Sequence, residues 1–241
     1  LKLRKAQITL QYMKLKGDVI VENKYKVNEI FLSIDGEGCR TGLPVVFVRL
    51  YGCNLNCSYC DTRYSCEQQE YKEMSLYDIL VEVLKYKVPR VTLTGGEPLI
   101  HPGVKDLIVS LVANDIEVNI ETNGAVDLDE FIEFKYNSKV VFTMDYKCKS
   151  SGMEDKMILS NLEFLQPKDV IKFVVSNYNE MEKMEYILES SKCKAQPYVS
   201  PVFGAIEPSE LVEYILDNKL NNVKVQVQLH KIIWEPTKRG V

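Results

Sequence analysis

Three cysteines lie close together in the sequence, at Cys53, Cys57 and Cys60. Three thiols at this spacing cannot all pair with one another as disulfides, whereas cysteine thiolates on short loops are the usual ligands of iron–sulfur clusters. Three such ligands would leave the fourth iron of a cubane cluster without a protein ligand. That open iron would offer a place for a substrate or a cofactor to bind.

A structural zinc site is the alternative interpretation of the same cysteines. Zinc in such sites usually has four Cys or His ligands at short spacing. Cys66, a few residues further on, could supply the fourth ligand. The cysteines by themselves therefore leave a cluster and a zinc site both open.

Two other positions combine a charge with an unusual setting. Glu37 stands between Gly36 and Gly38, and glycines allow a backbone to approach a ligand closely; a plain hairpin turn is the alternative. Arg49 interrupts the apolar run 44–51, where an unpaired charge would be costly. Its partner is either a carboxylate of the core or the carboxylate of a substrate, since Arg binds carboxylates through a planar fork.

The composition limits the kind of protein that this chain can be. Its 241 residues are 46% hydrophobic and 27% charged, which suits a single folded domain, and the formal net charge of −4 predicts no extended nucleic-acid surface. The seven cysteines follow no recognisable export signal, so we expect reduced thiols and a cytoplasmic location. No apolar run is long enough to cross a bilayer, so we expect no membrane partner.

Segments with strand patterns alternate with segments that have helical patterns. We expect strands at residues 25–34, 44–51, 90–93, 117–120, 140–144, 170–175, 198–202 and 223–229, and helices at residues 75–86, 104–113, 154–165, 179–190 and 208–218. Such alternation predicts βαβ units and a parallel sheet.

Polar residues and glycines recur directly after the expected strands. They include residues 53–62, 94–97, 121–124 and 145–147, Ser200 and His230. In a parallel α/β barrel all of these positions open on one face, where active sites lie. About six repeats fit the length, fewer than the eight of a full barrel. We therefore predict an α/β fold in a single domain, a partial (βα)6-type open barrel with a parallel sheet; a doubly wound open sheet is the alternative.

The segment 95–98, which reads Gly-Gly-Glu-Pro, follows the cysteines at a distance. The two motifs together resemble the radical S-adenosylmethionine (SAM) superfamily. More narrowly, the chain resembles the 7-carboxy-7-deazaguanine synthases of queuosine and 7-deazapurine biosynthesis. The matching segments are 28–38, 47–62, 94–98, 121–124 and 230–241. The resemblance implies a radical SAM catalytic domain over residues 25–241, preceded by an N-terminal extension of uncertain origin, residues 1–24, to which we assign no role.

The resemblance implies a lyase that converts 6-carboxy-5,6,7,8-tetrahydropterin to 7-carboxy-7-deazaguanine. Reductive cleavage of SAM would give a 5′-deoxyadenosyl radical, which would take the hydrogen at C6 of the pterin. The pterin ring would then contract with loss of ammonia. In the family the hydrogen returns from 5′-deoxyadenosine, and Mg²⁺ assists the contraction.

The resemblance also implies roles for individual residues. Cys53, Cys57 and Cys60 would bind a 4Fe–4S cluster, and Thr62 would bind Mg²⁺, whose other ligands would be water and substrate oxygens. The residues expected to bind the substrate are Ile34, Asp35, Gly36, Glu37, Arg49, Thr94, His230 and Val241. Those expected to bind SAM are Tyr59, Cys60, Asp61, Gly95, Gly96, Glu97, Glu121, Asn123, Asp145, Tyr146, Lys147 and Ser200. Asp35 departs from the family, which often has Gln at this position.

Two other functions share part of these features. An activase that places a glycyl radical on a partner protein would share both motifs but would not need Arg49. A non-enzymatic zinc or iron–sulfur module would use Cys66 as its fourth ligand. For the synthase, the resemblance implies an electron donor such as a flavodoxin, and a homodimer, since a small incomplete barrel has edges to cover.

Overall fold

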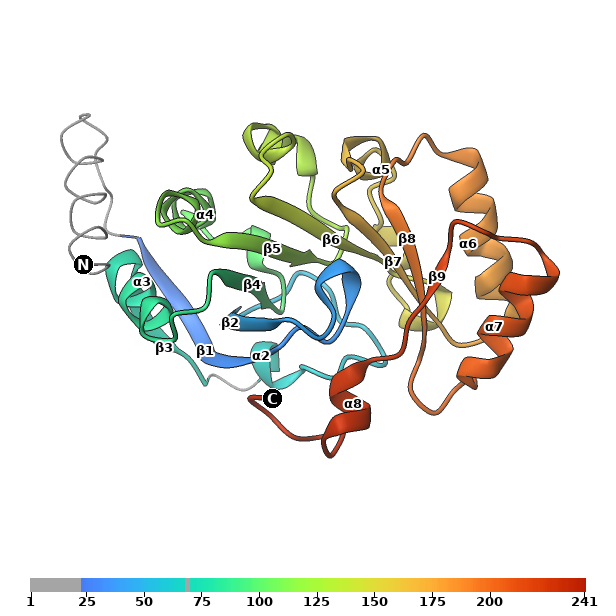
Figure 1. Ribbon diagram of the computed structural model, residues 1–241, viewed down its shortest axis with the longest axis horizontal. Helices are drawn as coiled ribbons and strands as arrows, with labels where there is room; N and C mark the ends of the chain where they lie inside the picture. The colour runs from blue at the N-terminus through green and yellow to red at the C-terminus, as the bar shows by residue number, and fades with distance from the viewer. Residues whose placement is uncertain (1–22, 68–69) are drawn as a thin grey trace.

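Nine strands form one sheet in the computed structural model, which describes residues 23–67 and 70–241. The sheet order is β3–β1–β2–β4–β5–β6–β7–β8–β9 (Figure 1). The strands are β1 (Lys24–Ile34), β2 (Pro44–Leu50), β3 (Lys72–Ser75), β4 (Arg90–Gly95), β5 (Glu117–Thr122), β6 (Val140–Tyr146), β7 (Val170–Val175), β8 (Gln196–Pro201) and β9 (Lys224–Val225). Neighbouring strands from β2 to β9 run parallel, whereas β1 pairs antiparallel with both β2 and β3.

The parallel strands are apolar because both of their faces are covered. Every residue of β7 is buried. Helices α3 (Leu76–Lys85), α4 (Val104–Ala113), α6 (Tyr178–Ser190) and α7 (Pro208–Asp217) lie along one side of the sheet, and α2 (Tyr64–Glu67) and α8 (Leu229–Ile233) lie on the other (Figure 1). The first group packs its apolar faces into the core, as Leu80, Leu111 and Met184 do. The second side is therefore left to loops and short helices.

The sheet is open within the described residues, because β3 and β9 stand at opposite ends of its order. This confirms the predicted α/β fold with an unclosed, mostly parallel sheet. Strand β7 and helix α4 begin and end at the residues predicted for them. Strand β3 was not predicted; it pairs with one edge of β1. Residues 1–22 of the predicted N-terminal extension lie outside the described part of the chain.

The predicted helix over residues 154–165 is wrong. A short 3-10 turn and α5 (Asn161–Phe164) occupy this region instead. The buried side chain of Asn161 accepts a hydrogen bond from the Leu128 N–H at 2.9 Å and donates one to the Gly124 carbonyl at 3.1 Å. Asn161 therefore anchors the loop that follows β5. The helix is interrupted before α5, where the Ile158 N–H donates to the Gly124 carbonyl at 3.2 Å and not to the carbonyl of Glu154, as an α-helix would require.

The predicted terminal strand over residues 223–229 is confined to β9, and α8 follows it. The side chain of Gln226 turns to the loop after β1, where it accepts a hydrogen bond from the Gly38 N–H at 2.7 Å and donates one to Thr41 Oγ1 at 2.5 Å. These contacts end the strand. His230 consequently lies in a helix rather than beside a strand end.

Candidate active site

A cavity of about 770 Å³ lies at the C-terminal ends of the parallel strands. Its volume is in the range of sites for small ligands and cofactors. Strands β2, β4, β5, β6 and β7 contribute Arg49, Thr94, Glu121, Asp145 and Lys172 to its lining. The polar side chains that the sequence places near strand ends are thus gathered on one face, as parallel α/β barrels require.

The cysteine loop joins β2 to α2 along one wall of this cavity. Cys53, Cys57 and Cys60 all line it, and each of the seven cysteines of the chain is a free thiol. Two N–H groups approach the Cys53 sulfur, the backbone N–H of Leu55 at 3.4 Å and the side-chain amide of Asn123 at 3.6 Å. These donors act to lower the pKa of Cys53, whereas a hydrogen bond with Cys66, followed by burial, outweighs them and raises that pKa. The thiolate is the form that binds metal.

The Gly-Gly-Glu-Pro segment packs against the cysteine loop. A Cβ on Gly96 would lie 2.3 Å from the carbonyl oxygen of Gly52 and 2.7 Å from Cys53 Cβ, so only glycine fits there without displacing the backbone. The side chain of Glu97 is buried and accepts a hydrogen bond from the Asn123 N–H at 2.7 Å. Burial raises the pKa of Glu97 to about 7 although such donors oppose the shift. Glu97 thereby ties the loop after β4 to the loop after β5.

The donor set of the cysteine loop fits a 4Fe–4S cluster. Three free thiols line one wall, N–H groups point at sulfur, and a glycine backbone lies beside them. In residues 23–67 and 70–241, no three His, Cys, Asp or Glu side chains converge as the ligands of one metal ion would. A cubane cluster does not need that convergence, because each thiolate binds a different iron. Thr62 Oγ1 lies 3.7 Å from Cys60 Sγ. A Mg²⁺ ion bound by this hydroxyl would take its other ligands from water or substrate.

Four charged side chains of alternating sign run through the cavity lining. Lys147 Nζ lies 2.7 Å from Asp145 Oδ2, and Lys172 Nζ lies 3.0 Å from the other oxygen of that carboxylate. The same Lys172 Nζ lies 2.7 Å from Glu37 Oε2. Burial acts to lower the pKa of Lys172, but the surrounding carboxylates, Asp145 foremost, outweigh it and hold that pKa well above its usual value. The site therefore keeps a permanent positive charge on β7.

Arg49 has the anionic partner that a buried guanidinium requires. Its Nε lies 2.7 Å from Glu29 Oε1, and the Tyr64 hydroxyl donates to the same oxygen at 2.8 Å. Within the described residues its two terminal amino groups donate no hydrogen bond, and the side chain lines the cavity. Nearby, Thr94 Oγ1 donates to Glu121 Oε2 at 2.6 Å. One edge of the Arg49 guanidinium is used by the protein, and the other is left for a ligand.

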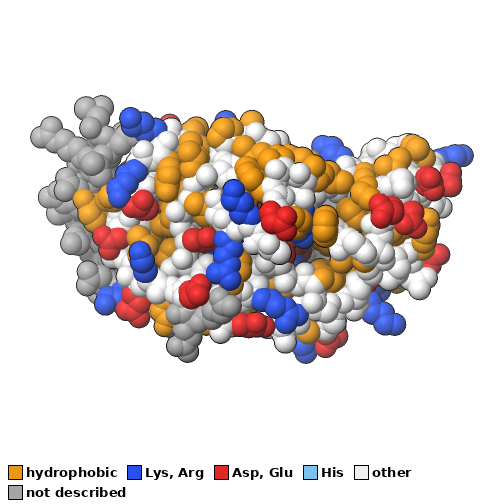
Figure 2. Space-filling view, turned by 90° about the horizontal axis from the view of Figure 1, so that it is seen from below, with side chains coloured by type: hydrophobic (Ala, Val, Ile, Leu, Met, Phe, Trp, Pro, Cys, Tyr) orange, Lys and Arg blue, Asp and Glu red, His pale blue; other side chains and the backbone are white. Residues whose placement is uncertain are grey.

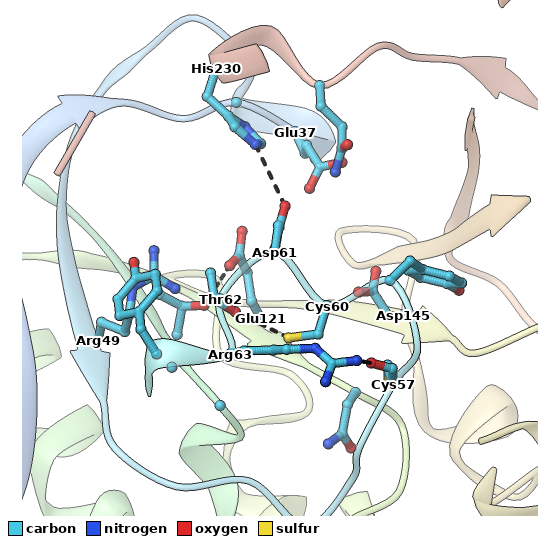
Figure 3. A pocket seen from close by; sticks show the side chains of 18 of the residues that line it. Glu37, Arg49, Cys57, Cys60, Asp61, Thr62, Arg63, Glu121, Asp145 and His230 are labelled. Atoms are coloured by element: carbon cyan, nitrogen blue, oxygen red, sulfur yellow. Dashed lines mark hydrogen bonds and ion pairs between the residues drawn. The ribbon is translucent and has the colours of Figure 1, made fainter. Parts of the chain in front are cut away.

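Helix α8 and the residues after it close the cavity from the side opposite the cysteines. Lys231 Nζ lies 3.1 Å and His230 Nε2 lies 3.8 Å from Asp61 Oδ2, which fastens α8 to the cysteine loop (Figure 3). Val241 lines the cavity at the end of the chain. Among the side chains drawn in colour in Figure 2, which shows the face that carries α8, acidic and basic groups are interspersed.

Most of the predicted site residues line the cavity. They are Gly36, Glu37, Arg49, Cys53, Cys57, Tyr59, Cys60, Asp61, Thr62, Thr94, Gly95, Gly96, Glu121, Asn123, Asp145, Lys147, His230 and Val241. Five others do not line it, namely Ile34, Asp35, Glu97, Tyr146 and Ser200. The Asp35 side chain is turned into the core, where it accepts a hydrogen bond from Thr92 Oγ1 at 3.0 Å.

Sequence reasoning missed two residues that shape the site. Lys172 lies among apolar neighbours in β7, the same signal that singled out Arg49 in β2. Arg63 directly follows the cysteine motif, and its Nη2 donates to the carbonyls of Cys57 at 3.1 Å and Ser58 at 3.0 Å. Arg63 carried no comparable signal, because an Arg in a polar loop is ordinarily exposed to solvent.

The fold and the site are those of a radical SAM enzyme, and the model of the Radical SAM superfamily matches residues 47–144. The chain is 49% identical to the 7-carboxy-7-deazaguanine synthase of Clostridium acetobutylicum over 221 residues, 90% of this chain and 99% of that protein. It is 35% identical to the 7-carboxy-7-deazaguanine synthase of Leptospira interrogans over 242 residues, 90% of this chain and 98% of that protein. The chain belongs to the 7-carboxy-7-deazaguanine synthase family.

A solved structure supports the same fold. The crystal structure of QueE from Escherichia coli matches with a TM-score of 0.67 at 24% identity, over 85% of this chain and 94% of that one. As a radical SAM enzyme, the protein uses a 4Fe–4S cluster and SAM, acts on a small molecule and requires a reductant. None of the helices in the described residues has the length and apolar character needed to span a membrane.

Proposed function

We propose that this protein converts 6-carboxy-5,6,7,8-tetrahydropterin to 7-carboxy-7-deazaguanine, the product for which its relatives are named, in queuosine and 7-deazapurine biosynthesis. Substrate and product differ by one ammonia, so the conversion needs no net oxidation or reduction. The observation that carries the proposal is a single cavity lined both by the three thiols and by two charged groups with free hydrogen-bonding atoms, Glu37 and Arg49. The cavity therefore has a cofactor side, formed by the cysteine loop, and a substrate side, formed by Glu37 and Arg49.

The cofactor side is built from the cysteine loop and the strand ends beside it. Cys53, Cys57 and Cys60 hold the cluster through their thiolates. When bound, the cluster and SAM would supply the radical chemistry needed to remove the hydrogen at C6 of the substrate. The SAM-binding residues of the cavity wall are Tyr59, Asp61, Gly95, Gly96, Glu121, Asn123, Asp145 and Lys147. Thr62 supplies one ligand to Mg²⁺.

The substrate side lies opposite, near α8. Glu37 Oε1 is buried and accepts no hydrogen bond within the described residues, so it is free to accept an N–H of the pterin ring. The terminal amino groups of Arg49 bind the substrate carboxylate in a charge-assisted contact. Thr94, His230 and Val241 complete the enclosure. The catalytic domain spans residues 25–241.

The proposal extends to the electron donor, the assembly and the location of the enzyme. A flavodoxin-type protein donates the electron that the cluster requires. Two copies form a homodimer, which covers edges that an unclosed sheet leaves exposed. The enzyme works in the cytoplasm, where its thiols stay reduced. Size-exclusion chromatography with light scattering tests the dimer.

Product analysis after anaerobic turnover tests the function. The protein is reconstituted with iron and sulfide, reduced, and mixed with SAM, Mg²⁺ and the carboxytetrahydropterin. We expect 7-carboxy-7-deazaguanine by mass spectrometry, together with one ammonia per product. An activase of a partner protein would leave the pterin unchanged, and a structural zinc module would bind no iron. Either result would reject the proposal.

A further inference from the structure

Lys172 occupies an unusual place for a lysine. It lies in β7, every residue of which is buried, and only 7% of its side chain is exposed. A buried ammonium group is costly unless it is paired. Lys172 Nζ has two carboxylate partners, Glu37 Oε2 at 2.7 Å and Asp145 Oδ1 at 3.0 Å. Its position in the cavity lining places this cation next to both groups of ligand-binding residues.

The two oxygens of Glu37 are in different situations. Oε2 is held by Lys172, and Oε1 is buried without a hydrogen-bond donor in the described residues. A buried acceptor left without a donor is costly, so a ligand that supplies an N–H to this oxygen binds more tightly. Lys172 therefore fixes which oxygen stays open and where it points.

Lys172 also connects the two sides of the cavity. Asp145 uses one oxygen for Lys172 and the other for Lys147, which lies 2.7 Å from it. Lys147 and Cys57 of the cysteine loop line the same cavity. The charges thus run from Glu37 to the loop that holds the cofactor. Lysine suits this junction, because its compact ammonium group can contact two carboxylates at once.

We propose that Lys172 is a positioning residue for substrate binding: it holds Glu37 with one oxygen open to an N–H donor of the pterin ring and aligns it with the Asp145 turn on the cofactor side. The proposal rests on the proposed function, because it assigns Glu37 to the substrate. Lys172 itself does not touch the reacting atoms. Removing the Lys172 ammonium group should weaken substrate binding only while Glu37 is present. A purely structural role would weaken binding whether or not Glu37 is present.

The test compares Lys172→Met, Glu37→Gln and the double variant in the reconstituted holoenzyme. The probe is pterin-6-carboxylate, a fluorescent analogue with the same ring edge that does not react. We expect each single variant to weaken its binding about tenfold or more, and the double variant to bind no more weakly than Glu37→Gln alone. In turnover with the tetrahydropterin, Lys172→Met should raise KM more than it lowers kcat.

Lys168→Met is the matched control. Lys168 also pairs with a fully buried carboxylate, Asp169 at 2.9 Å, but lies outside the cavity. It should lower stability and leave the dissociation constant of pterin-6-carboxylate unchanged. Unaltered binding in Lys172→Met, or additive losses in the double variant, would overturn the proposal. If Lys172→Met does not fold, the double variant, whose net charge is unchanged, is compared with Glu37→Gln. Equal dissociation constants for pterin-6-carboxylate support the proposal. Binding about tenfold weaker in the double variant than in Glu37→Gln rejects it.

Turnover of the unmodified enzyme tests the proposed function separately from the role of Lys172. Absence of 7-carboxy-7-deazaguanine after turnover of that enzyme would reject the function. Product formation combined with unaltered pterin binding in Lys172→Met would reject only the role of Lys172.

Discussion

Arg49 Nε and Glu29 Oε1 lie 2.7 Å apart, and the two residues are register partners in the antiparallel pair β1–β2. The sheet itself therefore sets the orientation of the guanidinium. This arrangement resolves two interpretations that the sequence left open, because Arg49 has a partner in the protein and also lines the cavity. A fixed guanidinium loses less conformational freedom when it binds a carboxylate than a free one does.

Replacing Arg49 with Ala should raise the KM for the carboxytetrahydropterin by a factor on the order of 10², as the loss of a charge-assisted contact of roughly 3 kcal/mol predicts. Steady-state kinetics measures this. Glu29→Gln is the control, because it removes the holding carboxylate and keeps the guanidinium, so its KM should rise much less. A KM close to that of the unmodified enzyme in Arg49→Ala would assign Arg49 to the core alone.

Replacing Cys57 with Ala should abolish assembly of the 4Fe–4S cluster, because the loop would then hold only two of the three iron ligands. Iron content and the brown absorption after anaerobic reconstitution measure this. Cys66→Ala is the control: Cys66 lines the same cavity, and its loss should leave about four irons per chain. Loss of metal in Cys66→Ala, with zinc bound by the unmodified protein, would favour the zinc site instead.

Replacing Thr62 with Ala should leave the cluster intact and weaken the dependence of the rate on Mg²⁺. The hydroxyl lies at the cavity, 3.7 Å from Cys60 Sγ, and it is a single ligand among waters and substrate oxygens. Turnover measured across a Mg²⁺ titration gives the result. An unchanged Mg²⁺ response would remove Thr62 from the metal site.

The stability of the protein should depend on pH through Asp35. Burial, followed by repulsion from Glu121, raises the pKa of Asp35 from 3.8 to about 7. Between these values the folded protein keeps a proton that the unfolded chain releases. The free energy of unfolding should therefore fall as pH rises through this window and then level off, by on the order of 1–4 kcal/mol from this group.

Asp35→Asn removes that titration while keeping an oxygen for the Thr92 hydroxyl. Urea unfolding of both proteins at pH 5 and pH 8 makes the comparison. The variant should gain stability relative to the unmodified protein as pH rises. Parallel pH dependences in the two proteins would show that Asp35 titrates normally in the fold.

The amino-acid sequence was sufficient to predict features that depend on local spacing. The cysteines and the Gly-Gly-Glu-Pro segment are short motifs. The cysteines alone left a cluster and a zinc site open, and the family resemblance carried by the two motifs together favoured the cluster. Strand β7 and helix α4 were placed correctly because apolar residues dominate β7 on both sides of Lys172 and recur at helical spacing through α4. The helix predicted over residues 154–165 failed because the Ile158 N–H donates to the carbonyl of Gly124, a residue far from it in the chain, and the local pattern gives no sign of that contact.

Only the tertiary structure decided which charges meet in the cavity. Glu37 and Lys172 are separated by 135 positions in the chain, and the sequence around either residue does not indicate that the other is its partner. Their contact depends on the order of strands in the sheet and on the loop after β1 folding over the end of β7. The sequence by itself located the cofactor site, because its three cysteines lie close together along the backbone, and the family resemblance of its two short motifs favoured a cluster over a zinc ion. The structure determined how substrate-side charges are held, because those contacts arise from packing between distant strands.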